Sequence, residues 1–190
     1  MIITHDLTCN LRNSLKIIFP EKPTEKFTCA EIGCFEGVGS VLIQNYLCNH
    51  GESRLICIDP WDDVHCKKGD KRMSFWDHAC RGQAARFKAN TKDYDKIVPM
   101  QGYSDEVIPK LEDESLDFVY VDGDHSPQQV YVDAVNIFPK MKSGSVILFD
   151  DYLWNMHGMV TKEGIDKFLT EYASKCTIIL NAYQLAVRVN

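Results

Sequence analysis

The sequence predicts an α/β domain with a mostly parallel sheet of seven strands, helices on both faces and an antiparallel C-terminal hairpin. Short apolar runs alternate along the chain with helix-length amphipathic segments, which is the pattern of strand–helix–strand units. The last two apolar runs, 176–180 and 184–189, are separated by only three residues, too few for a parallel crossover. The 190 residues, 45% of them hydrophobic, suffice for one full core, so we expect residues 1–190 to form a single domain.

The predicted elements follow in order from the N-terminus. Residues 1–27 form a helical extension with a helix at 6–19. The five parallel strands are predicted at 28–33, 54–59, 96–101, 116–122 and 144–150. Further helices are predicted at 38–49, 73–91, 104–111, 127–139 and 161–174. The stretch 61–80 follows a strand end and has no clear period, so we expect it to form a lid over the substrate.

Composition argues against several classes of protein. The apolar runs are far shorter than the ~18 residues that span a bilayer, and the N-terminus lacks the basic head and apolar stretch of a secretory signal. We therefore expect a cytoplasmic protein with no membrane partner. The net charge of −6 argues against a protein that coats nucleic acid. The segment 65–96 is nevertheless basic, with nine lysines and arginines against four acids.

The strongest chemical signal is the run from Glu31 to Ser40, E-I-G-C-F-E-G-V-G-S, which joins an apolar strand to a helix. Its glycines allow the backbone to turn tightly against a ligand, and a helix N-terminus favours a negative group. The alternative is an ordinary strand-to-helix turn. The glycine spacing differs from the Gly-x-Gly-x-x-Gly of dinucleotide-binding proteins, which disfavours a dehydrogenase. The next strand ends in Asp59, and an acid at that distance suits a pair of ribose hydroxyls.

Carboxylates follow two later strands. Asp122, Asp124 and His125 follow one strand, and Asp150 and Asp151 follow the next. If these strands are neighbours in the sheet, Asp122, Asp150 and Asp151 converge in one crevice as oxygen ligands for Mg²⁺ or another hard cation. The alternative is that these carboxylates cap helices or contact a cofactor.

From about residue 28 to the C-terminus, the sequence resembles the class I S-adenosylmethionine-dependent methyltransferases. Within them it resembles the O-methyltransferase branch that includes the catechol, caffeoyl-CoA and macrolide-sugar enzymes. Four ordered motifs carry this resemblance: 31–40, Asp59, the run from Gly102 to Pro109, and the two strand ends with their carboxylates. The resemblance implies a Rossmann-like fold and S-adenosylmethionine as cofactor.

The resemblance also implies roles for individual residues. The implied cofactor contacts are Glu31, Gly33, Cys34, Phe35, Gly37, Ser40, Asp59, Pro60, Trp61, Ser104, Asp105 and Asp122. Trp61 is expected beside the adenine. The implied metal ligands are Asp122, Asp150 and Asp151, and the implied catalytic residues are Asp122 and His125. His125 is expected to be the base, with Asp124 as second choice. A lysine stands near this position in the catechol-type members, whereas some macrolide-sugar members use histidine or aspartate.

The leading hypothesis is therefore methyl transfer from S-adenosylmethionine to a hydroxyl of a small molecule or sugar, with help from a divalent metal. One alternative is a nucleotide or RNA acceptor, bound as an anion through segment 65–96. Another is a catalytically inactive S-adenosylmethionine-binding module. If the protein associates with itself, the expected assembly is a homodimer. Acceptor choice is expected to come from the N-terminal helix, residues 61–80 and the loop 151–160.

Overall fold

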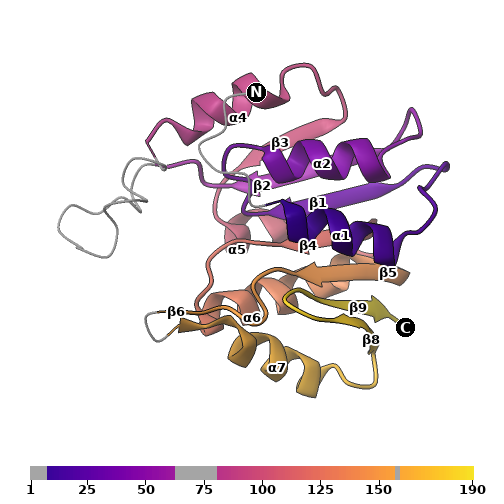
Figure 1. The fold of residues 1–190 in the computed structure, drawn as a ribbon, viewed down its shortest axis with the longest axis vertical. Helices are drawn as coiled ribbons and strands as arrows, with labels where there is room; N and C mark the ends of the chain where they lie inside the picture. The colour runs from indigo at the N-terminus through magenta and orange to yellow at the C-terminus, as the bar shows by residue number, and fades with distance from the viewer. Residues whose placement is uncertain (1–7, 63–80, 157–158) are drawn as a thin grey trace.

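The computed structural model describes residues 8–62, 81–156 and 159–190, and it contains one large sheet of seven strands (Figure 1). In spatial order these strands are β3 (Ile97–Gln101), β2 (Arg54–Asp59), β1 (Thr28–Ile32), β4 (Leu116–Val121), β5 (Met141–Phe149), β9 (Leu185–Val189) and β8 (Cys176–Asn181). The first five are parallel to one another, and β9 is antiparallel to both β5 and β8. The predicted fold class and the C-terminal hairpin are confirmed.

The helices of the described residues are α1 (Cys9–Ile18), α2 (Val38–Leu47), α4 (Gln83–Thr91), α5 (Ser104–Val107), α6 (Pro127–Ile137) and α7 (Thr161–Glu171), with 3₁₀ turns η2 (Ile108–Lys110) and η3 (Phe138–Lys140). The helix predicted at 104–111 ends early because Pro109 has no N–H to continue the α-helical ladder. Pro139 ends α6 in the same way. The first part of the helix predicted at 73–91 lies outside the described residues. Within the loop predicted at 151–160, β6 (Asn155–Met156) and β7 (Met159–Val160) form a short antiparallel pair that sequence analysis did not predict.

Two apolar cores lie on opposite faces of the sheet. Residues alternate along each buried strand, as they must when successive side chains point to opposite faces. Thus Phe118 joins the core under α1 and α2, whereas Val119 joins the core under α6 and α7. Figure 1 shows α1 and α2 together over one face of the sheet. No helix of the described ranges is long and apolar enough to cross a bilayer.

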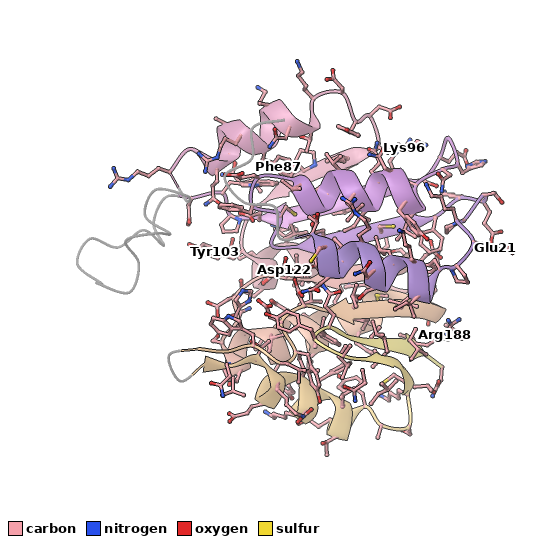
Figure 2. The ribbon with its side chains drawn as sticks, viewed as in Figure 1. Glu21, Phe87, Lys96, Tyr103, Asp122 and Arg188 are labelled. Atoms are coloured by element: carbon pink, nitrogen blue, oxygen red, sulfur yellow. The ribbon has the colours of Figure 1, made fainter. Side chains whose placement is uncertain are left out.

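The parallel register brings the carboxyl ends of the central strands to one edge of the sheet. The ladder continues one residue past each strand. Gly33 N donates to Ile58 O, Asp122 N donates to Ile32 O, and Asp150 N donates to Val121 O, each at 2.9 Å. Gly33, Asp122 and Asp150 therefore sit side by side at this edge, where ligands bind in open α/β sheets. In Figure 2, Asp122 lies at this edge, and Lys96 and Arg188 lie at the opposite one.

Candidate active site

The loop after β1 is pressed against the end of β4. Gly33 has a φ of 84°, and a Cβ at this position would lie 2.1 Å from the carbonyl oxygen of Asp122. Only glycine fits both this backbone conformation and this contact. Gly37, with a φ of 82°, precedes the first residue of α2. Gly33 thus allows the loop to lie directly against the end of β4.

Glu31 is buried beneath this loop, with only 2% of its surface exposed. Its carboxylate accepts hydrogen bonds from the hydroxyl of Ser40 and from Cys57 Sγ. A Cβ on Gly39 would lie 2.4 Å from Glu31 Oε1, so this glycine makes room for the carboxylate. Burial raises the pKa of Glu31 from its ordinary value of 4.5 to about 7, even though the Ser40 hydrogen bond lowers it. The structure thus brings the predicted residues Glu31 and Ser40 into contact.

Asp59 holds the same loop from the end of β2. Its Oδ2 accepts the backbone N–H groups of Cys34 and Phe35, both at 2.9 Å, and its Oδ1 accepts the N–H of Trp61 at 2.7 Å. Phe35 and Trp61 have φ values of 46° and 44°, a left-handed backbone that is rare for aromatic residues. Three hydrogen bonds to one carboxylate stabilise these strained turns. Burial raises the pKa of Asp59, and the backbone N–H groups oppose that rise.

Trp61 packs inward rather than standing open beside the loop. Its indole ring is buried against Phe87 of α4, with ring centroids 4.4 Å apart, and its Nε1 donates to Phe35 O at 2.9 Å. The neighbouring Pro60 offers its carbonyl oxygen to Gln101 Nε2 at 3.0 Å. The adenine contact of Trp61 and the cofactor contact of Pro60 stay predictions.

Ser104 and Asp105 begin α5, next to α6. Ser104 Oγ donates to Asp133 Oδ1 at 2.5 Å, and Gln129 Nε2 donates to the same oxygen at 2.9 Å. Asp133 is almost fully buried, and this burial raises its pKa. Sequence reasoning missed Asp133 and Gln129. The available signal was an acid on the apolar face of a helix, between Val130 and Ala134.

Asp122, His125 and Asp151 form one of two groups of described residues that could hold a metal ion; the other, Glu31, Cys34 and Cys57, is buried. In the first group, one ligand atom from each residue lies within 4.8 Å of the others. His125 Nε2 is 3.0 Å from Asp151 Oδ2. Burial raises the pKa of Asp122 well above its ordinary value, and the negative charges of Asp150, Asp151 and Glu31 raise it further.

Asp150 does not belong to that group, and its carboxylate accepts three hydrogen bonds. Its Oδ2 accepts Tyr120 OH at 2.5 Å, and its Oδ1 accepts Gln184 Nε2 and the N–H of Asp151, both at 2.8 Å. The structure therefore places all three predicted carboxylates at one edge, but it gathers Asp122 and Asp151 with His125 rather than with Asp150.

His125 is fixed from three sides. Besides Asp151, its ring meets Trp154 edge-on at 5.1 Å between centroids, and its carbonyl oxygen accepts Thr161 Oγ1 at 3.1 Å. Asp124, the second candidate base, is exposed, and its Oδ1 accepts the N–H of Ser126 at 2.6 Å. Among the described residues, no hydrogen-bond partner of His125 Nδ1 is found. That nitrogen is therefore available to a ligand.

Part of the predicted acceptor-binding surface falls outside the described residues. This holds for positions 63–80, which are most of the predicted lid and the first half of the basic segment 65–96. In the described half, Arg86 pairs with Glu36 at 2.5 Å, and Lys96 Nζ donates to Cys48 O at 2.7 Å. These two basic side chains are used inside the fold.

Comparisons with known proteins agree with this architecture. A family model described as a methyltransferase domain matches residues 30–152. No curated protein matches the chain in sequence.

Three solved structures illustrate the likeness in fold. The O-methyltransferase NovP is 17% identical, with a TM-score of 0.68, over 95% of this chain and 78% of that one. TomG from Streptomyces achromogenes, an O-methyltransferase involved in tomaymycin synthesis and solved with SAM, is 19% identical, with a TM-score of 0.59 and the same coverage. An O-methyltransferase from Bacillus cereus in complex with SAH is 16% identical, with a TM-score of 0.61, over 98% and 84% of the two chains. At these identities the likeness establishes the fold.

Glu31→Gln should remove a pH dependence of stability. Because folding raises the pKa of Glu31 from 4.5 to about 7, the folded state favours the protonated acid. Its contribution is full below pH 4.5 and is lost as the pH rises to about 7, a loss of about 3 kcal/mol. Urea unfolding at pH 5 and pH 8 should therefore show the variant gaining stability over the parent at the higher pH. The exposed Glu52→Gln is the control. Parallel pH curves for parent and Glu31→Gln would contradict the assignment.

Proposed function

Because the chain belongs to the methyltransferase domain family, we propose that it transfers the methyl group of S-adenosylmethionine to a hydroxyl oxygen of a small molecule or sugar. One observation carries this proposal. Asp122, His125 and Asp151 gather at the carboxyl ends of β4 and β5, beside the glycine loop after β1. A cofactor seated along that loop would present its methyl group to an acceptor held by these three side chains.

The residues around the loop suit S-adenosylmethionine. Gly33, Cys34, Phe35 and Gly37 would line its methionine part, with Glu31 and Ser40 supporting the loop from below. A carboxylate offers about four acceptor positions, and Asp59 uses three for backbone N–H groups. One position remains for a ribose hydroxyl. Ser104 and Asp105 would contact the adenine.

The donor set also suits a divalent cation. Asp122, Asp150 and Asp151 are hard oxygen donors. Burial raises the pKa of Asp122, and repulsion from Asp150 and Asp151 raises it further. A cation would relieve this repulsion, and Asp122 and Asp151 would hold it, with Asp150 beside them. Such an ion would lower the pKa of the acceptor hydroxyl and help to orient it. The carboxylates themselves contribute by fixing the acceptor oxygen in line with the methyl group.

His125 is the residue that would take the acceptor's proton. Its Nε2 faces Asp151 Oδ2, so an ionised Asp151 keeps the proton on Nε2 and leaves the lone pair on Nδ1. Nδ1 is therefore the atom that accepts the hydroxyl proton as the oxygen attacks the methyl carbon. Asp122, on the preceding strand end, would orient the acceptor at the same point.

The alternatives have less support. The positions of Asp122, His125 and Asp151 argue against an inactive binding module. A nucleotide or RNA acceptor would depend on the segment 65–96. Among its described basic residues, Arg86 and Lys96 are used inside the fold, whereas Arg81, Lys88 and Lys92 are exposed. A homodimer and a cytoplasmic location stay predictions.

Metal removal should stop turnover without releasing the cofactor. With a panel of catechols, other phenols and sugars as acceptors, formation of S-adenosylhomocysteine should cease in EDTA and return with Mg²⁺ or Mn²⁺. Calorimetry should show that S-adenosylhomocysteine still binds in EDTA, because the cofactor contacts are mostly on other residues. Full turnover in EDTA would remove the metal from the proposal and leave Asp122, Asp150 and Asp151 as structural and cofactor-contacting groups.

His125→Ala should lower turnover by ~10²–10⁴, the range for loss of a general base. An acceptor with a more acidic hydroxyl should lose less, because it needs less help to ionise. His50→Ala is the matched control, since His50 precedes β2 at the opposite edge of the sheet. Equal loss for weakly and strongly acidic acceptors would assign His125 a role other than proton removal.

A further inference from the structure

The turn of the C-terminal hairpin supplies a side chain to each of the two carboxylates that follow β5. Tyr183 OH donates to Asp151 Oδ1 at 2.6 Å, and Gln184 Nε2 donates to Asp150 Oδ1 at 2.8 Å. We propose that Tyr183 and Gln184 are positioning residues of the acceptor site, which orient Asp151 toward His125. This inference rests on the proposed function, because it concerns the same site.

The side-chain amide of Gln184 can face Asp150 in only one of its two orientations. Its side chain is 2% exposed, and its Oε1 accepts the hydroxyl of Ser14 from α1 at 2.6 Å. Its Nε2 therefore faces Asp150, and it also lies 3.4 Å from Tyr120 OH. A flipped amide would set its oxygen against the Asp150 carboxylate and leave Ser14 without an acceptor. The N-terminal helix thus fixes the amide, and the amide fixes Asp150.

Asp150 in turn holds the backbone of Asp151. Asp151 has a φ of 52°, a left-handed conformation that costs energy for a residue with a side chain. Its N–H donates to Asp150 Oδ1 at 2.8 Å, and its carbonyl oxygen accepts the N–H of Trp154 at 2.9 Å. A strained backbone persists only where several surrounding contacts hold it. Here Asp150 provides one such contact, and the hydrogen bond from Gln184 holds Asp150 in place.

Tyr183 selects which oxygen of Asp151 meets His125. With Oδ1 engaged by the Tyr183 hydroxyl, Oδ2 is the oxygen that lies 3.0 Å from His125 Nε2. Without the hydroxyl, the carboxylate is free to rotate, and His125 loses a fixed partner. Tyr183 is 39% exposed, so replacing it with phenylalanine removes the hydroxyl and opens no cavity.

Tyr183→Phe tests this inference against a matched control. In Tyr131→Phe the same hydroxyl is lost from a tyrosine that donates to Glu171 at 2.7 Å, on the outer surface between α6 and α7. Tyr183→Phe should lower kcat by about 10- to 100-fold, the range for residues that orient site ligands. The S-adenosylhomocysteine affinity from calorimetry should stay at the parent value. Tyr131→Phe should match the parent in both measurements.

A second measurement needs neither acceptor nor metal. At pH 8, the ¹⁵N signals of the His125 ring, assigned by their loss in His125→Ala, should show a protonated Nε2 and a bare Nδ1 in the parent and in Tyr131→Phe. In Tyr183→Phe the two signals should move toward each other as both tautomers become populated. Ser14→Ala should shift them in the same direction, by less. Unchanged His125 signals in Tyr183→Phe would overturn the inference.

The two measurements separate the inference from the proposed function. If the parent methylates no acceptor of the panel but Tyr183→Phe still alters the His125 signals, the proposed function fails and the positioning role stands. If the parent is active and Tyr183→Phe retains its full kcat, the positioning role in the reaction is wrong.

Discussion

The contact between Gly33 and the backbone of Asp122 is the constraint on which the site depends. The ends of β1 and β4 approach so closely that no side chain fits at Gly33, where a Cβ would lie 2.1 Å from a carbonyl oxygen. Backbone hydrogen bonds of the sheet continue into this contact: Gly33 N donates to Ile58 O of β2, and Asp122 N donates to Ile32 O of β1. The loop that we propose to bind the cofactor and the end of β4 that carries Asp122 are thereby set at a fixed distance before any ligand binds.

The second constraint is electrostatic. Glu31, Asp122, Asp150 and Asp151 share this edge of the sheet. Burial raises the pKa of both Asp122 and Glu31, and the charges of Asp150, Asp151 and Glu31 raise that of Asp122 further. A cluster of acidic groups of this kind favours positive charge. The sulfonium of S-adenosylmethionine and a divalent ion are both cations. Either proposed ligand would therefore offset the repulsion among these carboxylates. Without a bound cation, Ser40 holds the Glu31 carboxylate by a hydrogen bond, and Tyr120 and Gln184 hold that of Asp150.

The sequence was informative where the chemistry is local. Alternating apolar runs located the parallel strands, and the short link 181–183 required the terminal hairpin. The acids at strand ends could be placed together because parallel strands share their carboxyl edge, so Asp122, Asp150 and Asp151 were expected in one crevice. The structure places all three at that edge, but it groups Asp122 and Asp151 with His125.

What could not be predicted depends on pairs of side chains far apart in the chain. Gln184 meets Asp150 across 34 residues, and Tyr183 meets Asp151 across 32. Neither residue lies in a recognisable motif. The same is true of Asp133, whose partner Ser104 is 29 residues away. The inward packing of Trp61 on Phe87 was also hidden, since α4 has no sequence signal that points to the loop.

A crystal structure of the protein with S-adenosylhomocysteine and Mn²⁺ would test the central claim most directly. The account predicts the cofactor along the loop after β1, with its sulfur facing Asp122 and His125. It also predicts an anomalous manganese peak within ~2.5 Å of oxygens of Asp122 and Asp151. A cofactor bound elsewhere, or a sulfur turned away from these residues, would contradict the proposed reaction site. A cofactor in place with no manganese at saturating concentration would contradict the metal-assisted form of it.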